Sequence, residues 1–92
     1  MWAIYEGPEA RKNLKRLPLE ILRRYEKWKD IVRYSGPDGL SLIKGFHDEA
    51  LGGEWRGFRS SRLNLRYRVI YEAVKQDVLV SVIKITPHDY RR

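Results

Sequence analysis

Apolar residues follow a helical period between positions 8 and 34 and a strand-like pattern from position 54 onward, and this division limits the folds available. Five apolar residues between positions 18 and 34 recur three or four positions apart: Ile21, Leu22, Tyr25, Trp28 and Val32. This spacing predicts an amphipathic helix. Segment 8–17 has the same period and begins with a proline, which the first turn of a helix accepts, so it predicts a shorter helix.

Four other segments predict strands. WAIYE (2–6) is short and partly β-branched, and a Gly-Pro pair ends it. After a break at Ser35–Gly39, strand signals follow at 54–60, 65–74 and 78–85. The order is β-α-α-β-β-β, which predicts a single α+β domain over residues 1–92. We expect an antiparallel sheet with two helices packed on one face, so that the other face carries the arginines.

The charge of the chain favours a polyanionic partner. Nineteen Lys and Arg against twelve Asp and Glu give a net charge of +7 and a pI near 9.9. The sequence has no cysteine, which excludes disulfides and thiolate metal sites and fits a reducing cytoplasm. We find neither a signal-peptide pattern nor an apolar run long enough to span a membrane, so we expect a cytoplasmic protein without a membrane partner.

Five arginines fall within thirteen residues, on two predicted strands that should pair: Arg56, Arg59, Arg62, Arg66 and Arg68. Like charges opposite one another on a sheet are destabilising unless an anion compensates them. Phosphate suits this role because it accepts two hydrogen bonds from one guanidinium. The alternative is a solvated sheet face with scattered ion pairs to neighbouring carboxylates.

The two histidines, His47 and His88, lie in polar segments at the rim of this predicted face. RNA can be cleaved without a metal where a base activates the ribose 2′-hydroxyl and an acid protonates the leaving 5′-oxygen. A histidine suits either proton transfer, and arginines stabilise the charge that develops on phosphorus. Neither histidine has the spacing of a zinc site, so we expect no metal and no cofactor.

Residues 44–90 contain three distinctive features: the motif WRGFR (55–59), the motif YRVIY (67–71) and a histidine near the end of the sequence. Together they resemble the RelE superfamily of bacterial toxins. WRGFR (55–59) and a histidine near the end of the sequence resemble the YafQ branch, and YRVIY (67–71) resembles the RelE and YoeB branches. The order of these motifs, and not any one of them, makes the resemblance specific.

The resemblance implies the toxin of a type II toxin–antitoxin module. Such a toxin is a ribosome-dependent mRNA endonuclease that cleaves the codon in the ribosomal A site and leaves a cyclic phosphate. Its partners are mRNA, the ribosome with its ribosomal RNA, and a cognate antitoxin protein that silences it.

The resemblance also implies roles for individual residues. Arg59 and Arg68 are expected to contact the scissile phosphate, with His88 as general acid and His47 as general base. Tyr90 is the aromatic residue expected to stack on or orient a base. Five further residues are expected to contact RNA or support the site: Lys44, Arg56, Arg62, Arg66 and Asp89.

Two other functions stay open at this point. A ParE-like inhibitor of DNA gyrase has the same fold and needs no acid–base pair. A non-catalytic nucleic-acid-binding module would use the arginine face only to hold phosphates.

Overall fold

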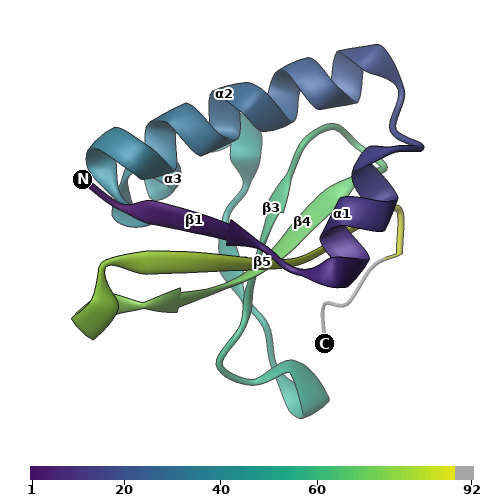
Figure 1. The fold of residues 1–92 in the computed structure, drawn as a ribbon. Helices are drawn as coiled ribbons and strands as arrows, with labels where there is room; N and C mark the ends of the chain where they lie inside the picture. The colour runs from purple at the N-terminus through teal and green to yellow at the C-terminus, as the bar shows by residue number, and fades with distance from the viewer. Residues whose placement is uncertain (89–92) are drawn as a thin grey trace.

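The computed structural model describes residues 1–88, which form one mixed sheet covered by helices (Figure 1). In chain order the elements are β1 (Ala3–Glu6), α1 (Pro8–Leu14), α2 (Leu19–Ser35), α3 (Asp38–Ser41), η1 (Lys44–Phe46), β2 (Glu49–Ala50), η2 (Gly53–Trp55), β3 (Arg59–Arg62), β4 (Arg68–Val74), η3 (Lys75–Asp77) and β5 (Leu79–Thr86). Within this described part, no helix has the length and apolar character needed to cross a bilayer.

The sheet has the strand order β1-β5-β4-β3-β2. Strands β2 to β5 pair antiparallel, and β1 runs parallel to β5. The α+β class and the two main helices on one face are therefore confirmed (Figure 1). The predicted antiparallel arrangement holds for β3, β4 and β5, whereas β1 joins the sheet in parallel; the two-residue β2 was not predicted because it is too short to give a pattern.

Helix α2 packs the predicted apolar stripe onto the sheet. Ile21, Tyr25, Trp28 and Val32 are buried, and Leu22 lies at the margin. The Trp28 ring stacks on Tyr25 and meets the edge of Tyr71 on β4, with centroids 5.7 and 5.3 Å apart. These large apolar contacts fix α2 across the middle of the sheet.

Turns make two strands start later than the sequence pattern predicts. Segment 54–60 becomes a strand only at Arg59, because η2 forms a 3-10 turn and Gly57 adopts a positive φ of 96°. Segment 65–74 becomes a strand only at Arg68, because the Asn64 side chain accepts hydrogen bonds from two following backbone N–H groups, at 2.8 and 2.6 Å. The first helix is shorter than predicted: α1 ends at Leu14, whereas the sequence pattern extended to position 17.

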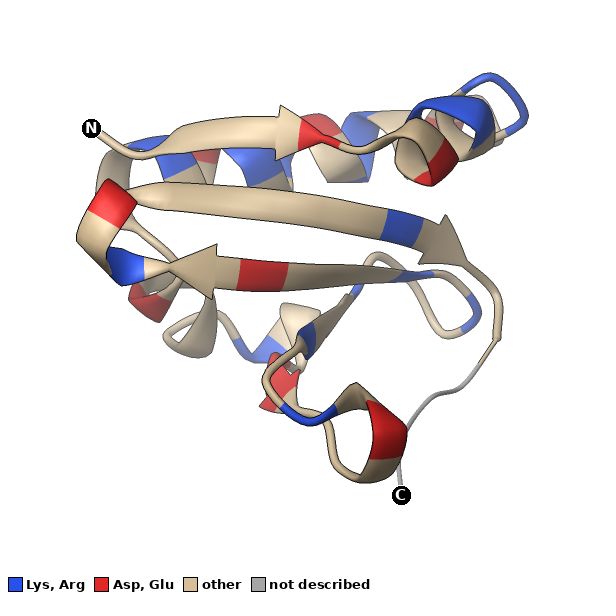
Figure 2. Ribbon diagram, turned by 60° about the horizontal axis from the view of Figure 1, so that its bottom comes forward, with Lys and Arg blue, Asp and Glu red and all other residues tan. Residues whose placement is uncertain are grey.

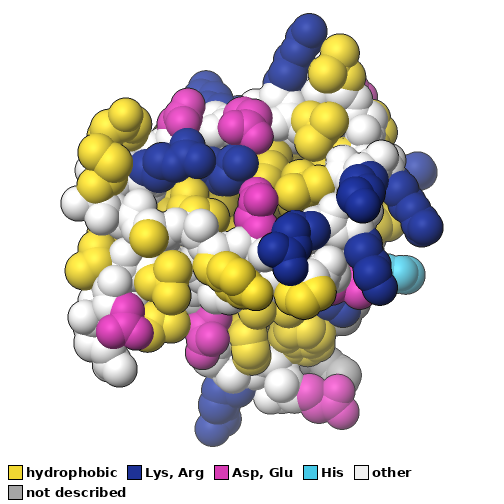
Figure 3. Space-filling model, in the orientation of Figure 1, with side chains coloured by type: hydrophobic (Ala, Val, Ile, Leu, Met, Phe, Trp, Pro, Cys, Tyr) yellow, Lys and Arg dark blue, Asp and Glu magenta, His cyan; other side chains and the backbone are white. Residues whose placement is uncertain are grey.

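Basic side chains also gather away from the sheet, over α1 and the turn that follows it (Figure 3). Four of them, in α1 and this turn, are exposed: Arg11, Lys12, Lys15 and Arg16. Exposed cations of this kind attract any polyanion over a range of about 10 Å at ordinary salt concentrations. The positive charge of the chain is therefore not confined to the strand arginines.

A candidate active site on the far face of the sheet

The face of the sheet turned away from α1 and α2, here called the far face, carries a row of three polar residues. Arg62 on β3 pairs directly with Arg68 on β4, and Arg68 pairs with Thr86 on β5. Directly paired residues of adjacent strands project from the same face, so these side chains lie beside one another. Figure 2 looks onto this face, with α2 behind the sheet.

The row brings positive charges together where water is scarce. Arg68 is only 5% exposed, and the buried Nε of Arg62 has no hydrogen-bond partner among the residues that the structure describes. Two like charges directly opposite one another destabilise a sheet, and burial strengthens their repulsion. An oxyanion bound between the two guanidinium groups would relieve both costs.

His88 lies just beyond this row. Its backbone N–H donates to the Thr86 hydroxyl at 3.2 Å, across Pro87, and its side chain is exposed. The predicted neighbours Asp89 and Tyr90 lie outside the described residues. The structure thus brings Arg62, Arg68 and His88 to one end of the sheet.

The short strand β2 adds a carboxylate that the sequence prediction missed. Glu49 pairs with Ser60, Ser60 pairs with Ile70, and Ile70 pairs with Lys84. Ser60, Ile70 and Lys84 each lie two residues along their strand from Arg62, Arg68 and Thr86. Because side chains alternate between the faces of a strand, the two rows lie on the same face. No sequence signal could reveal Glu49, because a two-residue strand has no detectable alternation.

His47 lies at the edge of the same region. It caps η1 in the left-handed conformation with a φ of 45°, and its Nε2 is 3.9 Å from a Glu49 carboxylate oxygen. The His47 side chain is largely exposed, whereas that of Glu49 is partly covered. Either group could exchange a proton with a ligand at this edge.

The loop around η2 covers part of the far face. Lys84 places its ammonium over the Trp55 ring, 5.3 Å from the centroid, and Trp55 meets Phe58 edge to face at 5.3 Å. Lys84 and Trp55 therefore border the candidate site on the side of η2. Arg56 follows η2 and is exposed.

Arg59 lies on the opposite face from Arg62 and Arg68. It pairs with Tyr71, whose ring packs beneath α2, so its side chain projects toward the helices. The expectation that all the strand arginines share one face is wrong for Arg59. Its position in the strand explains this, because it is an odd number of residues from Arg62.

Asp48 holds Arg59 in this position. One Asp48 oxygen accepts hydrogen bonds from Arg59 Nε and Nη2 at 2.9 and 2.8 Å, and the other accepts from the Ser61 and Tyr71 hydroxyls at 2.7 Å each. Trp28 Nε1 donates to Ser61 Oγ at 2.9 Å. The Asp48 side chain is 1% exposed, so these donors replace the water that its charge has lost.

The same network shifts two pKa values. Burial, followed by the charge and hydrogen bond of Asp48, raises the pKa of Tyr71, so that its hydroxyl remains a donor. Burial alone would lower the pKa of Arg59, but the hydrogen bond and charge of Asp48 outweigh this effect and raise it. Asp48 and Arg59 thus form a charged anchor between the loop before β2 and the sheet.

The remaining predicted contacts lie outside the polar row of the far face. Lys44 is exposed on η1, and Arg66 is exposed in the turn before β4. Within the described residues 1–88, no group of three or more His, Cys, Asp or Glu side chains is arranged to hold a metal ion.

Solved structures with the same architecture identify the superfamily. The chain matches the archaeal RelE–RelB complex from Pyrococcus horikoshii OT3 with a TM-score of 0.75 and 27% identity, over 94% of this chain and 93% of the other. The chain belongs to the RelE superfamily. The resemblance predicted from its strand motifs is therefore confirmed.

Two further RelE-superfamily structures share the fold at lower identity. A mutant of YafQ from E. coli matches with a TM-score of 0.75 and 16% identity, over 96% of this chain and 94% of the other. The YoeB–YefM complex from Staphylococcus aureus matches with a TM-score of 0.74 and 17% identity, over 97% of this chain and 99% of the other. Comparison of the sequence with protein-family models and with curated proteins gives no match.

Proposed function

We propose that this chain is the toxin of a type II toxin–antitoxin pair, a ribosome-dependent endoribonuclease that cleaves mRNA in the A site. The observation that carries the proposal is the row in which Arg62, Arg68 and Thr86 pair across three strands, with His88 two residues beyond. Similar RelE and YoeB chains have been solved as complexes with RelB and YefM, which supports an antitoxin as partner.

In this proposal the arginine pair binds the scissile phosphate. Arg62 and Arg68 approach from adjacent strands and donate hydrogen bonds to its non-bridging oxygens. Their charge stabilises the extra negative charge on phosphorus in the transition state, in a place where water competes weakly. The chemistry needs no metal, because these cations supply the electrostatic stabilisation.

Two proton transfers complete the reaction. A base removes the proton of the ribose 2′-hydroxyl, whose oxygen forms a bond to phosphorus while the bond from phosphorus to the 5′-oxygen breaks. His88 donates a proton to that leaving oxygen. The products are a 2′,3′-cyclic phosphate and a 5′-hydroxyl, and each proton transfer contributes roughly 10²- to 10⁴-fold to the rate.

The base lies at the Glu49–His47 edge. Both groups are at the same sheet margin, 3.9 Å apart. Glu49 is favoured because its strand register directs it onto the far face, whereas His47 lies on the turn before β2. His47 is retained as the alternative base.

The other predicted residues take supporting roles. Arg59 supports the site through Asp48, since two of its guanidinium nitrogens already bind that carboxylate. Lys44, Arg56 and Arg66 contact the RNA backbone at the rim. Asp89 and Tyr90 keep their predicted roles beside His88, as an orienting carboxylate and a base-stacking ring.

The test is to induce the wild-type chain and its His88→Gln variant in bacterial cells and to map mRNA 5′ ends. We expect cuts within translated codons for the wild type and their loss in the variant. Lys27→Gln, an exposed change on α2, is the control and should cleave like the wild type. Gyrase-dependent DNA breaks without mRNA cuts would contradict the nuclease and establish the ParE-like activity.

A further inference from the structure

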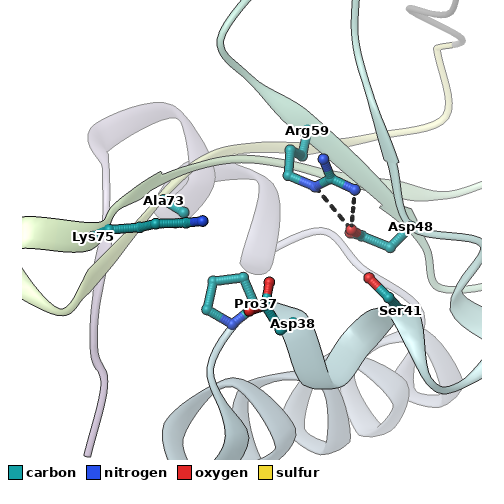
Figure 4. A pocket seen from close by; sticks show the side chains of 7 residues that line it. All are labelled: Pro37, Asp38, Ser41, Asp48, Arg59, Ala73 and Lys75. Atoms are coloured by element: carbon teal, nitrogen blue, oxygen red, sulfur yellow. Dashed lines mark hydrogen bonds and ion pairs between the residues drawn. The ribbon is translucent and has the colours of Figure 1, made fainter.

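A cavity of about 330 Å³ lies on the helix-bearing side of the sheet, at the opposite end of β3 and β4 from the Arg62–Arg68 pair (Figure 4). Its lining comes from α3 and the residue before it, the loop before β2, the start of β3, the end of β4 and the start of η3. The lining residues are Pro37, Asp38, Ser41, Asp48, Arg59, Ala73 and Lys75. The cavity is separate from the proposed catalytic row.

Three side chains of the lining carry hydrogen-bond donors. Lys75 is exposed and has no ion-pair partner among residues 1–88, and Figure 4 shows it reaching toward the cavity from the side opposite Arg59. Arg59 is 36% exposed, and Asp48 engages its Nε and Nη2 but not its Nη1. Ser41 adds a hydroxyl. Such donors suit an oxyanion.

The two carboxylates of the lining differ in what they offer to a ligand. Each oxygen of Asp48 already accepts two hydrogen bonds, so Asp48 has little capacity left. Asp38 is exposed, and its charge opposes that of Lys75. The formal charges of Arg59 and Lys75 are therefore balanced by Asp48 and Asp38, and the cavity exerts little long-range attraction on a small free anion.

We propose that this cavity binds a carboxylate side chain from an acidic segment of a partner polypeptide. Lys75 and Arg59 recognise the carboxylate by short-range hydrogen bonds, and the rest of the segment supplies affinity through the net charge of +7 on this chain. A free anion lacks that second contribution. The proposal does not depend on nuclease activity, because none of the far-face residues lines the cavity.

Nuclear magnetic resonance titration of the full chain tests this proposal with three probes: a blocked tetraglutamate peptide, a blocked tetraglutamine peptide and inorganic phosphate. We expect tetraglutamate alone to shift the amide signals of Ser41, Ala73 and Lys75. Lys75→Gln should weaken its binding about fivefold, as expected for losing one exposed ion pair. Lys27→Gln removes one exposed charge that does not line the cavity, so it is the matched control and should weaken binding less than Lys75→Gln does.

Three results would overturn the proposal. The first is that tetraglutamate shifts only the amide signals of the basic residues in α1 and α2. The second is an unchanged affinity in Lys75→Gln, provided that its spectrum shows the native fold. The third is binding of phosphate to the same residues as tightly as tetraglutamate, which would assign the cavity to a free anion.

Discussion

Arg62 and Arg68 lie directly opposite each other on β3 and β4, on the face of the sheet that the helices leave uncovered. Repulsion between them opposes folding, and burial of the Arg62 Nε without a hydrogen-bond partner among the described residues adds to that cost. A binding role explains why two arginines are paired at this position of the sheet. An oxyanion bound between them would neutralise their repulsion and accept hydrogen bonds from both.

Replacing one arginine of the pair should raise the stability of the chain and lower its RNA-cleaving activity. Arg62→Gln removes the repulsion and should raise the free energy of unfolding by about 0.2–1 kcal/mol, as expected for a cross-strand like-charge pair. The same change should lower RNA cleavage, because one phosphate ligand is lost. Urea unfolding and single-turnover cleavage measure the two effects, with Lys27→Gln as control. A variant that is less stable and fully active would contradict the prediction.

The Glu49–His47 edge can be resolved by paired substitutions. Glu49→Gln keeps the shape of the side chain and removes its ability to accept a proton, so cleavage should fall by roughly 10²- to 10⁴-fold. His47→Gln should cleave nearly as well as the wild type. The measurement is the single-turnover rate on ribosome-bound mRNA. The reverse pattern would assign the base to His47.

The sequence predicted the fold well because its periodic segments are long. The α2 stripe and the alternation around Val69 and Tyr71 are packing patterns, and the structure buries those residues as expected. Neither the parallel pairing of β1 nor the presence of β2 has a local signal, because both depend on contacts between segments far apart in the chain.

The candidate site was only partly predictable, since sequence shows which residue types are present but not which face they occupy. The predicted strand ended at position 60, whereas β3 runs from Arg59 to Arg62, so that Arg59 and Arg62 share one strand and project from opposite faces. Asp48 diverts Arg59 into the buried network, and Glu49 reaches the far face through a two-residue strand. Both depend on tertiary pairing, which composition and spacing do not encode.

Asp48 should be the most sensitive acidic residue for stability. Asp48→Asn leaves Arg59 without its counter-charge and disturbs the hydrogen bonds from Ser61 and Tyr71. Removing one partner of a buried ion pair costs about 3–5 kcal/mol, and the partial exposure of Arg59 places the expected loss near the lower end. Urea unfolding followed by circular dichroism measures it, with exposed Asp77→Asn as control. A loss no larger than that of the control would show that the network contributes little.

Stability should fall in alkaline solution because of Tyr71 and Tyr25, since burial raises the pKa of both hydroxyls, and Tyr71 can be tested by itself. Its pKa is raised in the folded chain above the ordinary value of 10.0, so above about pH 10 the unfolded chain releases the proton first and unfolding becomes easier. This stabilisation is complete below pH 10 and is lost as pH rises toward the folded-state pKa. Thermal unfolding between pH 8 and 11 should show a decline that is shallower in Tyr71→Phe. Tyr34→Phe, which changes an exposed side chain, should retain the wild-type decline.

The central claim, that the Arg62–Arg68 row and His88 form a ribonuclease site, is tested most directly by the single-turnover rate of mRNA cleavage on programmed ribosomes. His88→Gln should keep the native fold, because the His88 side chain is exposed, and should lower the rate by about 10²- to 10⁴-fold. The wild-type product should end in a 2′,3′-cyclic phosphate. Cleavage by His88→Gln at the wild-type rate, or no cleavage by the wild type, would contradict the account.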